Sequence, residues 1–241
     1  MNTPDINEKR PMKLAAAGGA AAALSLLAAA LAWAAGESGR LDFAPATAKV
    51  NVMGTVGDST TSETRAAAQV RSTAVVYAIF GGLLGLGIGA AVALVGLVGR
   101  GGRAGYLPML AGLVAGVVAG AAGPIVVLPL YSRLVLDRAG EFLPSMATHA
   151  ALWLGFGVTA GLAWGLGVGD RRGLVRSVLM SVLCVALGAV IYEVLSAIAM
   201  PTSVTTDPVP AEAPARLMAL ACAALSACLG AVFSGAGRAA T

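Results

Sequence analysis

Six long stretches of the chain carry no charge or a single one, and this feature most constrains its fold. Five lack Asp, Glu, Lys and Arg altogether, namely Leu14–Ala35, Ser72–Gly99, Ala104–Ser132, Phe142–Gly169 and Leu217–Gly237, and a sixth, Ser177–Thr206, contains only Glu193. Each has the roughly 18 or more apolar-dominated residues that a helix needs to cross a bilayer. Only 12% of the 241 residues are charged, against about 25% in soluble domains. The sequence therefore predicts an all-α integral membrane protein with a six-helix transmembrane bundle.

Glycine recurs at every fourth position in three of these stretches. The positions are Gly81, Gly85 and Gly89, then Gly112, Gly116 and Gly120, then Gly157, Gly161, Gly165 and Gly169. Residues four apart lie on one helix face. An interior glycine costs a soluble helix about 1 kcal/mol relative to alanine, but in lipid small residues let two helix backbones approach closely. We therefore expect small-residue, glycine-zipper packing between the helices.

The basic residues indicate an orientation in the membrane. Short connections hold Arg100 and Arg103, and again Arg171 and Arg172, whereas the longer loops on the opposite side mix basic with acidic residues. By the positive-inside rule, both termini are expected in the cytoplasm. We expect a multi-pass protein of a cell membrane, of the bacterial cytoplasmic kind. The net charge of +4 follows from this distribution and predicts no nucleic-acid partner.

These observations divide the chain into a tail, six spans and three outer loops. We expect a cytoplasmic tail at 1–13, spans at 14–35, 72–99, 105–130, 149–169, 177–200 and 216–237, and outer loops at 36–71, 131–148 and 201–215. The first span could instead be a cleaved signal peptide, because it ends in a small-residue motif around Trp33. Its apolar run is longer than the roughly 7 to 15 residues of a signal core, which favours an anchor.

The first outer loop has local signals of its own. Ala48–Val56 alternates like a strand, and Gly57 with Asp58 indicates a turn. Thr60 and Glu63 have the spacing of a helix capping box. We expect a small outer cap with a hairpin, and a second helix that begins near residue 61 and stands above the bilayer as a contact surface for a partner.

Glu193 is the one ionisable side chain well inside a predicted span. A charge at that depth costs on the order of 2.5 to 3.5 kcal/mol, so its position favours a functional or structural site. Four-residue steps from Ser177 reach Glu193, which directs the carboxyl group into the bundle. Tyr192 and His149 are candidate members of the same polar or proton site. We nevertheless expect His149 to lie exposed at the outer interface, with Trp153 in the aromatic belt.

Several kinds of chemistry lack the residues they need. With one histidine, and with Cys184, Cys222 and Cys228 all inside predicted spans, the chain predicts no metal site. Its glycine-rich runs lack the flanking strand of a nucleotide-binding fingerprint. We expect no cofactor and no enzymatic activity. The preferred prediction is a structural or assembly role in the bilayer, alone, with copies of itself or with another membrane protein. The alternative is a small proton-linked transporter or pore that uses Glu193.

Overall fold

The protein is described here from a computed structural model. The structure describes residues 9–38, 41–52, 55–94, 105–134, 142–168, 171–201 and 208–236. Its helices and strands, in chain order, are α1 (Lys9–Glu37), β1 (Ala48–Val52), β2 (Thr55–Ser59), α2 (Ser62–Leu94), α3 (Leu107–Leu134), α4 (Phe142–Val168), α5 (Arg171–Ala199) and α6 (Ala213–Ala236). The described residues do not include Gly169, residues 1–8, or the parts of the expected outer loops at 135–141 and 202–207.

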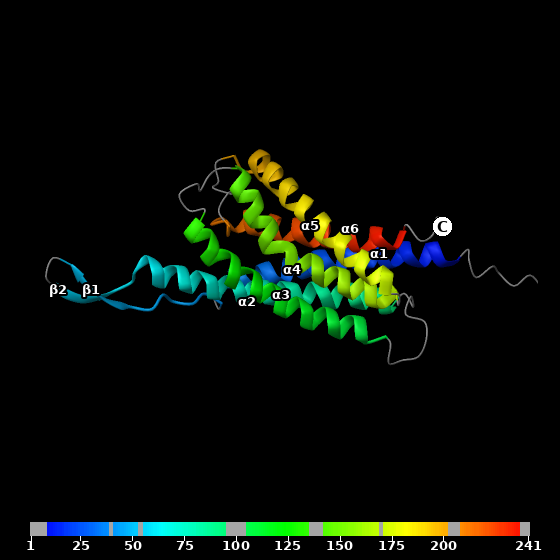
Figure 1. The fold of residues 1–241 in the computed structure, drawn as a ribbon, viewed down its shortest axis with the longest axis horizontal. Coiled ribbons are helices and arrows are strands. Elements are labelled where there is room, and N and C mark those ends of the chain that lie inside the picture. Colours follow the sequence, from blue (N-terminus) through cyan, green and yellow to red (C-terminus); the bar gives the residue numbers. More distant parts are fainter. Residues whose placement is uncertain are drawn as a thin grey trace, which may run out of the picture.

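The six helices form one bundle, and each is long and apolar enough to span a membrane (Figure 1). Every helix contacts the next one along the chain, and α1 also contacts α6, so the bundle closes on itself. In the apolar windows of α2, α4 and α6, 56% to 61% of the residues are buried, against 22% to 33% in α1, α3 and α5. The even-numbered helices therefore form the interior, and α4 contacts both of the others.

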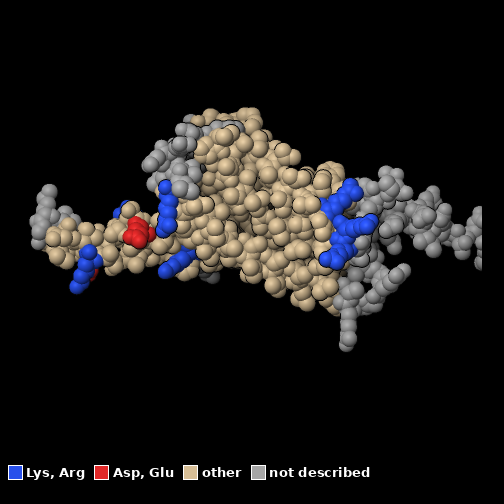
Figure 2. Space-filling model, in the orientation of Figure 1, with Lys and Arg blue, Asp and Glu red and all other residues tan. Residues whose placement is uncertain are grey.

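Four helices begin earlier than the apolar spans expected from the sequence, besides α2, whose start near residue 61 was expected. α1 begins at Lys9, α4 at Phe142, α5 at Arg171 and α6 at Ala213, where spans were expected from residues 14, 149, 177 and 216. In α1, α5 and α6 a charge interrupts the apolar run, but a helix can continue through it where water solvates the side chain, because the backbone hydrogen bonds are unaffected. In α4 the added turns from Phe142 carry no charge. Figure 2 shows the described Lys and Arg side chains gathered towards the two ends of the molecule, with none over its middle in this view.

α2 and α3 approach each other through their glycines. A methyl group placed on Gly81 would overlap the carbonyl oxygen of Gly116, and one placed on Gly85 would overlap that of Gly112. Gly116 and Gly112 meet Gly81 and Gly85 in the same reciprocal way. The bulky Val118 of α3 points outward instead and is 63% exposed. The two backbones are thus in contact along these turns, with no room for a side chain between them.

α4 meets α5 in a similar way, although the partner residues differ. A methyl group on Gly157 would lie 2.9 Å from the Cα atom of Val182, and one on Gly165 would lie 2.7 Å from that of Leu174. One on Gly161 would overlap the backbone at Val178. α5 places small buried residues, such as Ser177 and Ser181, near this contact.

The hairpin before α2 differs in register from the sequence prediction. β1 pairs antiparallel with β2, with Val52 opposite Thr55 and Lys49 opposite Asp58. Gly57 and Asp58 therefore lie within β2, and predicting the turn there was wrong. Two short strands joined by two residues look like one alternating run in the sequence, which conceals the reversal between them.

The capping contact of α2 is also shifted by one residue. The backbone amide of Thr64 donates to Oγ1 of Thr61 at 3.2 Å, and the amide of Thr61 donates to Oγ1 of Thr64 at 3.0 Å. The reciprocal pair is thus Thr61 with Thr64, not Thr60 with Glu63, because a threonine hydroxyl takes the part of the expected carboxylate. From this cap, α2 and the hairpin project beyond the other helices (Figure 1).

Candidate functional site

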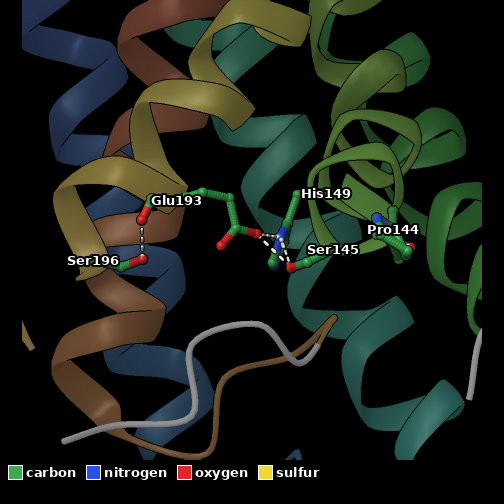
Figure 3. Close-up of polar contacts among 6 residues, drawn as sticks. Pro144, Ser145, His149, Glu193 and Ser196 are labelled. Atoms are coloured by element: carbon green, nitrogen blue, oxygen red, sulfur yellow. Dashed lines mark hydrogen bonds and ion pairs between the residues drawn. The ribbon is translucent and has the colours of Figure 1, made fainter. Parts of the chain in front are cut away.

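Glu193 lies on the inward face of α5, less than two turns before that helix ends at Ala199. It is 2% exposed, and the residues that precede it in four-residue steps, Ser177, Ser181, Val185 and Ala189, are buried as well. This is the direction that their spacing predicts. The side chain crosses from α5 towards the first turns of α4 (Figure 3).

Two side chains of α4 contact the same carboxyl oxygen. Nδ1 of His149 lies 2.7 Å from Oε1 of Glu193, and Oγ of Ser145 donates to that oxygen at 2.5 Å. Ser145 and His149 are one helical turn apart, and their Oγ and Nδ1 atoms are separated by 3.5 Å. The His149 and Glu193 side chains are each 1% exposed. A proton on either member of this pair gives a hydrogen bond, so the contact is satisfied as an ion pair or as two neutral groups.

The early start of α4 places His149 in the interior. Pro144 is in the first turn of this helix, a position that needs no amide donor, and its carbonyl accepts a hydrogen bond from Oγ1 of Thr148 at 2.8 Å. Because the helix begins at Phe142, His149 lies about two turns inside it rather than at its outer mouth. The expectation that His149 is exposed at the interface is therefore wrong.

Aromatic rings surround the histidine. The His149 ring lies 5.0 Å from that of Tyr192, in an edge-to-face arrangement, and 5.7 Å from that of Trp153. Trp153 and Tyr192 are themselves 5.6 Å apart. Trp153 is fully buried, so placing it in an aromatic belt at the interface was also wrong. The Tyr192 and Trp153 rings thus pack against the histidine and against each other.

Three polar atoms of this cluster have no hydrogen-bond partner among the described residues. They are Nε2 of His149, Nε1 of Trp153 and the hydroxyl of Tyr192. Buried polar atoms are usually paired, and an unpaired one indicates a bound water, a ligand or stored strain. The histidine therefore has hydrogen-bond partners at Nδ1, whereas its Nε2 atom has none among the described residues.

The structure brings together all three residues predicted for this site, Glu193, Tyr192 and His149. Sequence reasoning missed Ser145 and the inward position of Trp153. A signal was available, because Ser145, His149 and Trp153 are four residues apart, the same spacing that singled out the inward face of α5. No group of three or more His, Cys, Asp or Glu side chains that could hold a metal occurs in the described part of the chain.

The arrangement differs from a serine nucleophile triad. In such a triad the serine contacts one ring nitrogen of the histidine and the acid contacts the other. Here Ser145 and Glu193 both lie at Nδ1, and Nε2 has no described partner. The serine proton is therefore directed at the acid instead of the base.

No protein-family model, no curated protein and no solved structure matches this chain.

Proposed function

We propose that this chain is a non-enzymatic, multi-pass integral membrane protein with a structural or assembly role. The observation that carries the proposal is the enclosed contact of Glu193. A carboxyl group buried in the bundle is stabilised by His149 and Ser145 on a neighbouring helix, so the cluster fastens α4 to α5. The Glu193 side chain is 1% exposed, which indicates a contact enclosed by protein.

Glycine-zipper packing supports the same role. Within lipid there is no hydrophobic driving force between helices, so close van der Waals contact between backbones stabilises the bundle. The overlaps that any side chain at Gly81, Gly85, Gly112 or Gly116 would create favour this kind of packing between α2 and α3. We infer that Gly89 and Gly120 extend this contact, and that Gly157, Gly161 and Gly165 provide its counterpart on α4.

The proposed partners are the lipid bilayer and either a second copy of this chain or another membrane protein, with no nucleic acid. The projecting end of α2, with its hairpin, is the element available for such a contact, since every described β2 residue is exposed. We place the protein in a cell membrane of the bacterial cytoplasmic kind with both termini in the cytoplasm, on the basis of the short basic connections.

A second function, a proton-linked transporter or pore, is favoured by one observation. The unpartnered Nε2 of His149 and the hydroxyl of Tyr192 are next to Glu193 in the interior. A water held by these atoms would give a proton a neighbouring site, as in the relays of membrane transporters. The same residues would then load and release a proton.

Proton flux separates the two functions. The full chain is reconstituted in vesicles that contain a pH-sensitive dye, and an inward proton gradient is applied. The structural role predicts no flux above empty vesicles for the natural chain or for Glu193→Gln, with both folded. Flux through the natural chain that Glu193→Gln abolishes would replace the structural role with the transporter.

The packing proposal is tested at Gly116. Gly116→Leu places a side chain into the backbone of α2 and is expected to destabilise the bundle by about 3 kcal/mol, at the upper end of overpacking costs. Val118→Leu, on the outward face of the same helix, is the matched control. Detergent unfolding followed by circular dichroism measures both, and equal stability of the two variants would contradict glycine-mediated packing.

A further inference from the structure

A cavity of about 430 Å³ lies on the outer side of the bundle, between the first turns of α2 and the ends of α1 and α6. This volume is within the range of about 300 to 1,000 Å³ typical of small-molecule sites. One face of α2 lines it along more than three helical turns, at Arg65, Ala68, Gln69, Ser72, Thr73, Val76 and Tyr77. At 1.5 Å per residue, that face is about 18 Å long. The cavity is therefore elongated along α2.

The polarity of the cavity changes along its length. The end near the start of α2 has the exposed residues Arg65 and Gln69. The other end, further along α2, is apolar and enclosed, because Tyr77 is 7% exposed and Leu220 of α6 is 4% exposed. Trp33 of α1 adds a further ring to the lining. A molecule that fills this space needs an apolar body at one end and a polar group at the other.

The walls of the cavity are held in place by contacts within the protein. Nε and Nη2 of Arg216 contact the two carboxyl oxygens of Glu37 at 2.7 and 2.8 Å, which links α6 to α1. Nε1 of Trp33 donates to the carbonyl of Ala213 at 2.9 Å. The amide of Phe43 donates to Oγ of Ser72 at 3.0 Å, which attaches the segment after α1 to α2. The cavity is thus formed before any ligand arrives.

Two charges in the lining are not used in this way. Among the described residues, the guanidinium group of Arg65 donates only to the hydroxyl of Thr60, at 3.3 and 3.1 Å. Asp42 forms no ion pair with any other described residue, since the two ion pairs found there join Arg216 to Glu37 and His149 to Glu193. With respect to the part of the chain that the structure describes, the lining therefore offers one cation and one anion without an ion-pair partner. A purely anionic head would meet the carboxylate of Asp42, whereas a zwitterionic head complements both charges.

We propose that this cavity binds a single-chain zwitterionic amphiphile. Its anionic group, such as a phosphate, pairs with Arg65, and its ammonium group pairs with Asp42. The apolar chain extends down α2 towards Tyr77 and Leu220. This site shares no residue with the Glu193 cluster, so it does not depend on the function proposed above.

Native mass spectrometry of the full chain, released from maltoside micelles, tests the proposal with three probes. These are an alkyl phosphoethanolamine, an alkyl phosphoglycerol with the same chain, and free phosphoethanolamine without a chain. The first is expected to bind about tenfold more tightly than the second, a difference of about 1.4 kcal/mol. The free headgroup is expected not to bind, which identifies a membrane amphiphile rather than a soluble metabolite as the source. Equal binding of the two alkyl probes, or tight binding of the free headgroup, would overturn the proposal.

Variants of the two unpaired charges sharpen the test. Arg65→Gln is expected to weaken the zwitterionic probe about tenfold, whereas Arg71→Gln, an exposed residue on α2 outside the lining, leaves binding unchanged. Asp42→Asn is expected to remove the preference for the zwitterionic probe over the anionic one. Ala68→Phe fills the cavity and should abolish binding while the helical circular dichroism signal is retained. Equal losses with Arg65→Gln and Arg71→Gln, or a preference that survives Asp42→Asn, would contradict the assigned head positions.

Discussion

Two glutamates of this protein pair with a base on another helix, and their surroundings differ. Glu193 of α5 contacts His149 of α4, and Glu37 of α1 contacts Arg216 of α6, each with a shortest N to O distance of 2.7 Å. The first pair is 1% exposed on both sides, whereas the second is 33% and 30% exposed. The contact distance is the same, but only the first pair has been removed from water.

This difference decides what each pair does for the fold. A buried pair carries a large desolvation cost, so removing one partner leaves an uncompensated polar group and is strongly destabilising. A partly exposed pair is solvated whether or not it forms, and its net contribution is small. We therefore expect the Glu193 contact to be needed for the α4–α5 interface, and the Glu37 contact to orient the end of α1 and the start of α6 around the cavity along α2.

The largest effect is expected when the buried pair loses its base. His149→Ala should destabilise the protein by about 3 kcal/mol, because Glu193 keeps only Ser145 as a partner in a dry interior. Unfolding in a mixed detergent titration measures the change. Glu193→Gln is the control, since an amide oxygen of similar shape can still accept both hydrogen bonds and should cost less. A loss below about 1 kcal/mol for His149→Ala would mean that water reaches the site.

A smaller effect is expected for the serine of the same cluster. Ser145→Ala removes the hydroxyl that donates to Glu193 and should cost about 0.6 to 1.7 kcal/mol, the range found for hydrogen bonds between membrane helices. Ser132→Ala removes an exposed hydroxyl that donates only within α3, and we expect almost no change there. The same unfolding titration applies to both. Similar losses would show that burial adds nothing to this hydrogen bond.

The smallest effect is expected at the exposed pair. Glu37→Gln should cost less than about 1 kcal/mol, because Arg216 also donates to the carbonyls of Pro210 and Ala211 and stays solvated. A double-mutant cycle with Arg216→Gln gives the coupling energy at low and at high salt. The coupling should fall with salt, whereas that between His149 and Glu193 should not, because screening acts on solvated charges. Two couplings with the same salt dependence would remove the distinction between the pairs.

Much of the fold could be predicted from the sequence because it depends on local composition. Six apolar runs predicted six helices, and the structure has six that are long and apolar enough to cross a membrane. The helix ends were less predictable. The first turn of α5 contains charged residues that interrupt the apolar run without ending the helix, and the first turn of α4 contains Pro144 and Ser145. The hairpin turn and the cap of α2 were each misplaced because neighbouring residues offered similar local signals.

The candidate site could be predicted only in part. Glu193 stands out because it is alone in an apolar run, and its four-residue spacing from Ser177 indicates the inward direction. His149 was a candidate member of the site, but its burial and its direct contact with Glu193 could not be predicted, because its depth depends on where α4 begins and on how that helix is placed against α5. Ser145 gave only the four-residue spacing to His149 as a signal, since a serine near the end of an apolar run is ordinary. The contact requires two helices to be placed within hydrogen-bonding distance.

The sequence alone determined that the chain forms six long apolar helices, because hydrophobic composition and helical periodicity act within each segment. It also determined that one carboxyl group faces inward on α5. The tertiary structure decided that His149 and Ser145 meet that carboxyl group, that Glu37 pairs with Arg216, and that a cavity forms along α2. These features join residues 44 to 179 positions apart, and only the packing of whole helices sets such distances.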